Sequence, residues 1–255
     1  MTSENVWYLA YGSNMNSKVF KGRRQIKPMQ SMAARVPGWT LDFHLPSMPY
    51  FEPGMACVHR IEEGEDAQEL HGVLYEVTAD DYAHIRRTEG GGYKDTGYQD
   101  TDVECITYEG KKIHAKTLIR PSNHYQVENL LPSMRYITII RDGAKEHGLS
   151  SEYLEYLNSL KHYVHNETWG KAIGRWIVLL MLLPFAIPFL LAMIASMFFK
   201  VTAPRLVYVY FMHFGKFSWL LHDLVLSRIF GSGKSNLGIL SPIPIKKAAQ
   251  KLFNK

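Results

Sequence analysis

Two short motifs, about 75 residues apart, carry the residue types from which an acyl-transfer site can be built. The first, Tyr11-Gly12-Ser13-Asn14, follows a short apolar segment. The second, Thr88-Glu89-Gly90-Gly91-Gly92-Tyr93, places one carboxylate on a glycine-rich loop. Backbone N–H groups in a turn of small residues can hold an oxyanion, and a positioned carboxylate can move a proton. Together the motifs indicate a reaction that passes through a tetrahedral intermediate.

Each motif alone also has an ordinary explanation. Most glutamates on loops are solvated and inert, and Gly, Ser and Asn favour the turns that end strands. Glu89 stands out because the three glycines after it allow a ligand to approach the backbone closely. The two motifs in this order and at this distance are more specific than either one by itself.

The elements that must position these motifs are short strands with a few helices between them. Alternating apolar residues and turn residues predict strands at 6–11, 31–36, 39–44, 55–61, 70–77, 103–108 and 112–119. Pro37-Gly38 and Glu109-Gly110 are expected to turn two hairpins. Capping residues and helical spacing predict helices at 16–22, 78–88, 133–147 and 151–160. This pattern is typical of an α+β fold with a largely antiparallel sheet or small barrel.

Several motifs, taken together, are similar to those of the gamma-glutamylcyclotransferase family. They are Tyr11-Gly12-Ser13-Asn14, then Leu70-His71-Gly72-Val73-Leu74-Tyr75, then Glu89-Gly90 with Tyr93, then Tyr136, and finally Gly143-Ala144-Lys145-Glu146-His147-Gly148-Leu149. The resemblance covers residues 5–160. It implies a small, mostly antiparallel β-barrel with flanking helices in a catalytic domain at 1–160.

The resemblance also implies an activity and its residues. The reaction would cyclise the gamma-glutamyl group of an amide to 5-oxoproline and release the amine, with neither cofactor nor metal. Glu89 matches the family's catalytic glutamate. The loop of Tyr11, Gly12, Ser13 and Asn14 matches the one that holds the glutamyl group, and Tyr93 and Tyr136 match tyrosines that line the pocket.

Two departures from the family pattern bear on the substrate. The run of glycines after Glu89 is longer than usual, and the glutathione-specific relatives resemble a Tyr-Gly-Ser-Leu loop where this chain has Asn14. The expected substrate is therefore a gamma-glutamyl amino acid or adduct rather than free glutathione. A membrane-anchored scaffold of the same fold that has lost catalysis is the alternative, and the intact Glu89 argues against it.

The remaining residues, 161–255, differ in charge from the first 160. They hold 12 Lys and Arg against 2 Asp and Glu, whereas residues 1–160 hold 17 against 22. Basic and apolar residues in one region favour an anionic membrane surface as the partner. Nucleic acid is the weaker alternative, because no binding motif accompanies the charge.

Three segments make up this second region. The uncharged run 176–199 is long enough to cross a membrane, and Pro184 and Pro188 make it either a kinked span or a hairpin. Residues 206–230 are expected to form an amphipathic helix on the membrane surface, and 231–255 a flexible basic tail. A buried core helix and a surface helix are the respective alternatives. Residues 1–6 lack the features of a signal peptide, so the catalytic domain is expected to face the cytosol.

Two other patterns have little predictive value. Cys57 and Cys105 show no metal or redox spacing, and a disulfide between them stays open. Gly231-Ser232-Gly233-Lys234-Ser235 looks like part of a phosphate loop, but position 228, where the motif needs a glycine, is Arg228.

Overall fold

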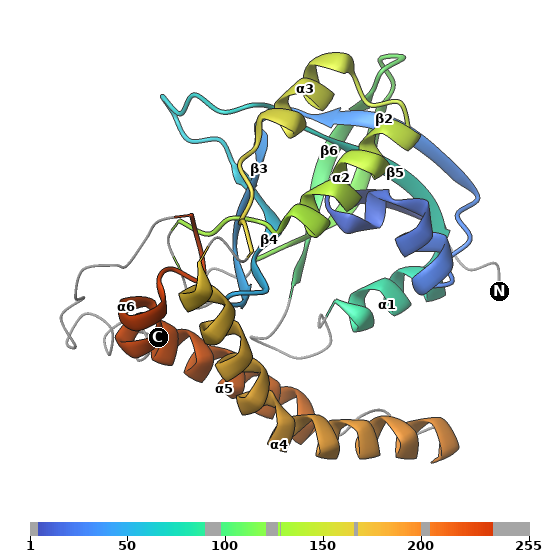
Figure 1. The fold of residues 1–255 in the computed structure, drawn as a ribbon. Helices are drawn as coiled ribbons and strands as arrows, with labels where there is room; N and C mark the ends of the chain where they lie inside the picture. Colours follow the sequence, from blue (N-terminus) through green and yellow to red (C-terminus); the bar gives the residue numbers. More distant parts are fainter. Residues whose placement is uncertain are drawn as a thin grey trace. The chain divides into compact units, whose positions relative to one another are not determined.

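The computed structural model describes residues 5–89, 98–120, 127, 129–165, 168–199 and 205–236. Contacts divide the chain into two compact units, coloured along the sequence in Figure 1. The first consists of Met1–Leu45, Met55–His124 and Met134–His162, and the second of Pro46–Gly54, Tyr125–Ser133 and Tyr163–Lys255. The last junction lies close to the boundary expected at residue 160, and two short earlier segments also belong to the second unit.

The first unit is built on a closed five-stranded barrel. Its strands follow the order β1-β5-β2-β6-β7, and β7 closes the barrel by pairing parallel to β1. The other neighbouring strands are antiparallel. Their bounds are β1 (Asn5–Ala10), β2 (Gln30–Val36), β5 (Leu70–Thr78), β6 (Gln99–Thr107) and β7 (Lys112–Ile119). The expectation of an α+β fold with a small, mostly antiparallel barrel is confirmed.

One of the two expected hairpins is wrong. β6 and β7 do pair across Glu109-Gly110, where Gly110 has a φ of 86°. The chain also turns at Gly38, but β2 pairs with β5 and β6 instead of with the strand that follows it. Because both edges of β2 are occupied, β3 (Trp39–Met48) pairs with β4 (Glu52–Arg60) in a separate two-stranded sheet.

Helices pack against the barrel. Ile137, Ile140 and Ala144 lie on the buried face of α2 (Met134–Glu146), at the helical spacing that the sequence shows. Thr78 caps α1 (Ala79–Thr88) by accepting a hydrogen bond from the backbone N–H of Asp81. The remaining helices of this unit are the 3₁₀ helix η1 (Ser13–Met15), the π-helix η2 (Lys18–Arg23) and α3 (Ser151–Ser159). The π-helix η2 lies where a helix was expected at 16–22, and α3 confirms the helix expected at 151–160.

The second unit is helical. It contains α4 (Trp169–Phe199), α5 (Arg205–Leu221), the π-helix η3 (His222–Leu226) and α6 (Ser227–Phe230). A small hydrophobic cluster of Tyr50, Val178 and Leu226 joins its segments, and Trp219 packs with Val127 and Leu130 in another.

The expected membrane segment at 176–199 is wrong. Among the described residues, no helix has both the length and the apolar character that crossing a membrane requires. The run is the greater part of a longer helix, α4, which also carries Lys171 and Arg175. One side of this helix packs on protein, because Val178 is fully buried against Tyr50 and Leu226. The expectation of a membrane anchor with a catalytic domain that faces the cytosol depended on this segment and is therefore wrong as well.

The amphipathic helix expected at 206–230 is helical, but its burial follows the expected faces only in part. His213 and Lys216 are exposed as expected, whereas Asp223 and Ser227 are buried and Phe217 is 52% exposed. The sequence pattern defines two faces of a helix but does not say which one packs inward. A role for this helix at a membrane surface has no support in the structure.

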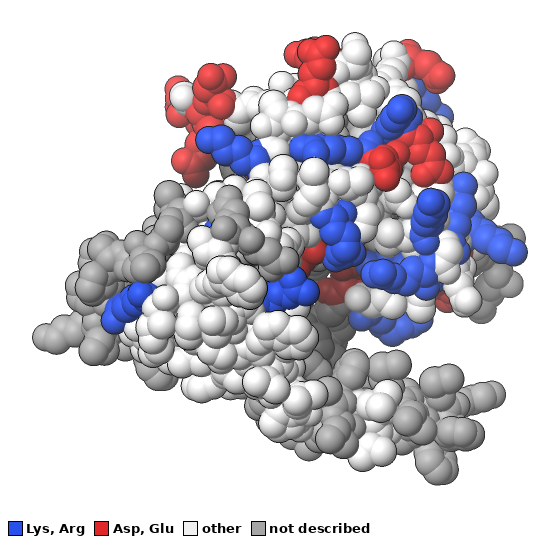
Figure 2. All heavy atoms as spheres, in the orientation of Figure 1, with Lys and Arg blue, Asp and Glu red and all other residues white. Residues whose placement is uncertain are grey.

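The start of the expected basic tail is ordered and buried. Ser232, Lys234 and Ser235 are all buried, and Tyr50 donates a hydrogen bond to the carbonyl of Gly231 (2.9 Å). Residues 237–255 lie outside the described part. On the face drawn in Figure 2, Lys, Arg, Asp and Glu gather over the barrel unit, and most of the described surface of α4 is uncharged.

Candidate active site

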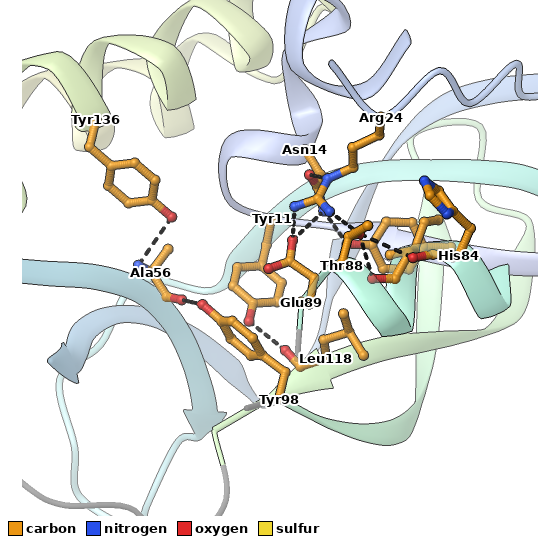
Figure 3. A network of polar contacts seen from close by, with 12 residues as sticks. Tyr11, Asn14, Arg24, Ala56, His84, Thr88, Glu89, Tyr98, Leu118 and Tyr136 are labelled. Atoms are coloured by element: carbon orange, nitrogen blue, oxygen red, sulfur yellow. Dashed lines mark hydrogen bonds and ion pairs between the residues drawn. The ribbon is translucent and has the colours of Figure 1, made fainter. Parts of the chain in front are cut away.

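Glu89 stands at the C-terminal end of α1, where the helix stops. Its backbone N–H still donates to the carbonyl of Ile85 (3.0 Å), so the helix holds the residue in place. The side chain is 20% exposed and extends toward the loop that follows β1 (Figure 3). Asn14 donates from Nδ2 to Glu89 Oε1 at 3.1 Å, which joins the two motifs that the sequence separates by 75 residues.

The loop of Tyr11–Asn14 leaves the barrel at the end of β1 and turns at once into η1. The turn is closed by backbone bonds from Met15 N–H to Gly12 O (3.0 Å) and from Asn16 N–H to Ser13 O (3.1 Å). Gly143 of α2 lies directly against this turn, since a Cβ at that position would come within 2.6 Å of Asn16 N. Close packing on α2 therefore fixes the position of the loop.

These residues line a single pocket of about 370 Å³, a volume that includes the space at its mouth. Tyr11, Gly12, Ser13, Asn14, Glu89 and Tyr136, all expected from the sequence, meet in it. The remaining expected residue, Tyr93, lies outside the described residues. The pocket also contains residues that the sequence analysis did not single out, namely Tyr8, Met55, Ala56, Tyr98 and Leu118.

Four tyrosines, Tyr8, Tyr11, Tyr98 and Tyr136, are among the residues that line the pocket. Burial raises the pKa of Tyr8, of Tyr11 and of Tyr98 well above the usual range, so all three remain neutral at physiological pH. Tyr11 donates to the carbonyl of Leu118, and Tyr98 donates to the carbonyl of Ala56 (2.8 Å). The pocket wall therefore offers hydrogen bonds without adding charge.

Tyr136 reaches the pocket from α2. Its hydroxyl accepts a hydrogen bond from the backbone N–H of Ala56 on β4 at 3.3 Å, and its ring meets Phe43 edge-on. Gly12 faces this hydroxyl, because a Cβ added at Gly12 would lie 3.4 Å from it. Tyr136 and the Tyr11–Asn14 loop therefore border the same space, as the resemblance implied.

Arg24 is the charged residue that sequence reasoning missed. Its guanidinium forms an ion pair with Glu89 Oε1 and donates from Nε to Asn14 Oδ1 at 2.7 Å (Figure 3). The side chain of Arg24 is 13% exposed. One signal was available: an arginine soon after the Tyr11–Asn14 loop can face the same ligand. Nothing in the local pattern distinguishes it from Arg23, so only the fold identifies it.

The described residues show no metal-binding arrangement. Within the ranges given above, no three His, Cys, Asp or Glu side chains are grouped so that they could hold an ion. Cys57 and Cys105 are both free thiols, and burial raises the pKa of Cys105 to about 12. The open question of a disulfide between them is thereby answered.

Comparisons with known proteins agree with this geometry. Residues 69–157 match the model of the AIG2-like family. The gamma-glutamyl cyclotransferase aclK of Aspergillus oryzae is 30% identical over 253 residues, an alignment that covers 89% of each chain. The gamma-glutamylcyclotransferase of Bos taurus is 30% identical over 158 residues, 62% of this chain and 80% of its own. The fungal relative therefore matches both units, and the bovine one a shorter part.

Solved structures show the same fold. A structure titled gamma-glutamyl cyclotransferase superposes with a TM-score of 0.53 at 25% identity and covers 65% of this chain and 93% of its own. A human protein titled uncharacterized protein loc79017 gives the same TM-score at 26% identity and covers 66% of this chain and 96% of its own. The first of the two titles names the same activity as the curated relatives.

Proposed function

This chain belongs to the gamma-glutamylcyclotransferase family and is an enzyme of that class, and we propose that its substrate is a gamma-glutamyl amino acid or a gamma-glutamyl adduct. The enzyme cyclises the glutamyl part to 5-oxoproline and releases the amine. The observation that carries the proposal is the pocket itself, in which the Glu89 carboxylate, the Tyr11–Asn14 loop and Tyr136 meet.

The chemistry needs a nucleophile, a proton carrier and donors for an oxyanion. The α-amine of the substrate is the nucleophile, so its attack on the γ-carbonyl carbon is intramolecular, and holding the chain in a folded conformation supplies much of the rate. That amine is an ammonium at neutral pH and must first lose a proton. Glu89 is the acceptor, because its carboxylate borders the pocket.

The proton that Glu89 has accepted is used again later in the reaction. Attack forms the new C–N bond and a tetrahedral oxyanion, and in this proposal the backbone N–H groups of Gly12 and Ser13, which border the pocket, hold that oxyanion. The intermediate collapses as the original amide C–N bond breaks, and Glu89 returns its proton to the departing nitrogen. The ring nitrogen, which still carries two protons after the attack, gives up one of them by way of the Glu89 carboxylate, and the amine leaves with it as an ammonium. Glu89 ends the cycle ionised, and no external oxidant, reductant or second substrate takes part.

The substrate class rests on Asn14. Its amide is committed to Tyr8, Arg24 and Glu89, with the Nδ2 to Tyr8 hydroxyl distance at 2.9 Å. A leucine at this position, as in the Tyr-Gly-Ser-Leu loop of glutathione-specific relatives, could make none of these bonds. We therefore expect this pocket to differ from theirs in how it holds the acid/base residue and in which compounds it favours.

A substrate panel tests the proposal. The purified full-length chain is incubated with gamma-glutamyl amino acids, S-substituted glutathione adducts and free glutathione, and 5-oxoproline is measured by mass spectrometry. We expect release from one of the first two classes and at least 100-fold less from the Glu89→Gln variant, as loss of an acid/base group typically gives about 10²–10⁴. Preference for free glutathione would contradict the substrate class, and no 5-oxoproline from any compound would contradict the activity.

A further inference from the structure

Arg24 occupies a position between the catalytic carboxylate and the loop that holds the glutamyl group. Its three kinds of N–H group contact three different acceptors, shown together in Figure 3: Nε donates to Asn14 Oδ1, Nη1 to Thr88 Oγ1 and Nη2 to Glu89 Oε1. Two of these acceptors belong to the end of α1 and one to the loop after β1. The guanidinium therefore ties together the two motifs of the site.

The local backbone is unusual in a way that directs this side chain. Arg24 directly follows the π-helix η2, and π-helical turns occur often at functional sites. The next residue, Gln25, has a φ of 57°, a left-handed conformation that costs energy for a residue other than glycine. Buried side chains anchor both sides of the turn: Phe20 stacks on Tyr75 at 4.1 Å between ring centroids, and Ile26 is fully buried.

Both contacts to the Glu89 side chain end on the same oxygen. Arg24 and Asn14 donate to Oε1, and among the described residues no hydrogen bond to Oε2 is present. Asn14 is itself held, because its Nδ2 also donates to the hydroxyl of Tyr8 and its Oδ1 accepts from Arg24. The carboxylate is therefore oriented through one oxygen, and the other is the one available for a proton.

We propose that Arg24 is a positioning residue of the reaction: through Oε1 it holds the Glu89 carboxylate so that Oε2 faces the substrate's amine and, later, the departing nitrogen. This inference rests on the proposed function. Arg24 neither accepts nor donates the transferred proton. Its contribution is geometric, since a misplacement of about 1 Å in a catalytic group can lower a rate by up to about 100-fold.

An arginine suits this position better than a lysine would. The planar guanidinium presents donors in fixed directions, and here each of its nitrogens serves a separate acceptor. A lysine ammonium carries the same charge but is a single point on a flexible stem. Comparing the two side chains at this position therefore separates the effect of charge from the effect of orientation.

The first test compares three variants of the full-length chain on its best substrate. We expect Arg24→Met to lower kcat by about 10-fold to 100-fold with a change in KM of less than about threefold, as for an interaction made mainly in the transition state. Arg24→Lys should recover part of that loss. Arg23→Met is the matched control, because Arg23 is the preceding residue and is exposed; its kcat should equal that of the wild type.

A double-mutant cycle separates positioning from general structural damage. In the Glu89→Gln background, which has no carboxylate to position, Arg24→Met should lower the residual rate by less than about twofold, whereas a merely structural role would give the same factor in both backgrounds. Thermal unfolding of each variant is measured in parallel, and Arg24→Lys supplies the comparison if Arg24→Met unfolds.

Two results would overturn the inference while leaving the proposed function intact. One is an active wild type with an equally active Arg24→Met variant. The other is an equal loss in the presence and absence of the Glu89 carboxylate. A wild-type chain that releases no 5-oxoproline from any gamma-glutamyl compound would overturn the proposed function and this inference with it.

Discussion

Two polar networks, one in each unit, differ in how accessible their charged groups are. In the barrel unit, Arg24 and Asn14 contact one oxygen of Glu89, and the carboxylate borders a pocket. In the helical unit, His222 is fully buried, and both its ring nitrogens have partners: Nδ1 lies 2.8 Å from Asp223 Oδ1, and Nε2 accepts from Gly233 N–H at 2.9 Å. A buried charge points to chemistry when it borders a cavity, and to structural support when its partners enclose it.

The comparison is tested most strongly by removing the titratable carboxylate of Glu89 from the network in the barrel unit. Glu89→Gln keeps the shape of the side chain, and we expect turnover to fall by about 10²–10⁴, since the proton carrier is lost. Turnover is measured as 5-oxoproline release, with binding of 5-oxoproline by calorimetry as the control for an intact pocket. Near-normal turnover would show that Glu89 is not the proton carrier.

The next largest effect is expected where the site loop packs against α2. Gly143→Ala would place a Cβ 2.6 Å from Asn16 N, a backbone atom that cannot move away cheaply. We expect a loss of about 1–3 kcal/mol in the free energy of unfolding, as for other overpacked positions, and reduced turnover because the loop shifts. Gly22→Ala is the control, because a Cβ at Gly22 meets nothing within 4 Å. Equal behaviour of the two variants would contradict the close packing.

The network around His222 in the helical unit should show the opposite behaviour, with a loss of stability and little change in turnover. His222→Leu removes the acceptor of the Gly233 N–H, and a buried donor without a partner costs about 1–2 kcal/mol of stability. Turnover by the folded protein should stay within about twofold of the wild type, because His222 is not among the residues that line the pocket. Chemical denaturation and the 5-oxoproline assay measure the two quantities. A large loss of turnover at full stability would assign His222 to the reaction.

The smallest expected effect concerns pH. Burial lowers the pKa of His222 below its ordinary value of 6.5, so below pH 6.5 the unfolded chain binds more protons than the folded one. The stability that the neutral His222 contributes is therefore complete above pH 6.5 and is lost as the pH falls through the folded-state pKa.

Comparison of two variants isolates that contribution. Burial lowers the pKa of His71 and His147 as well, whereas a hydrogen bond to Asp42 raises the pKa of His44, so the whole-chain pH profile combines several groups. Between pH 7.5 and pH 5.5 the melting temperature of the wild type should fall further than that of His222→Gln. Identical falls would show that folding does not lower the pKa of His222.

Much of the barrel unit could be predicted from local patterns. The turn at Glu109-Gly110, the cap at Thr78 and the buried face of α2 involve residues close in the chain, so their side chains and backbone preferences are visible in the sequence. Glu89 and the Tyr11–Asn14 loop were also found this way, through the resemblance of their motifs. What the sequence could not show is that Asn14 contacts Glu89 directly, because that bond depends on where α1 ends relative to β1.

Two of the errors, the membrane span at 176–199 and the faces of the helix at 206–230, share one physical cause. A run of apolar residues at 176–199 shows that the segment avoids water, but not what covers it, and in the structure Val178 is buried while Trp176 is 64% exposed. The polar residues of 206–230 likewise define a helix face without saying that Asp223 and Ser227 turn inward. The periodicity of a sequence shows which residues share a face of a helix, but only the elements that pack on the helix decide which face is buried.

The sequence by itself determined the class of fold and the positions of most strands and helices, because these depend on short-range preferences. Its motifs also supplied the residues that we propose carry the chemistry. Only the tertiary structure decided the order of strands in the barrel, the partner of β3, the contact of Arg24 with Glu89 and the burial of Ser232 and Lys234. Each of these joins residues far apart in the chain. Such pairings depend on which surfaces other elements occupy: β2 pairs along both of its edges, and β3 pairs with β4.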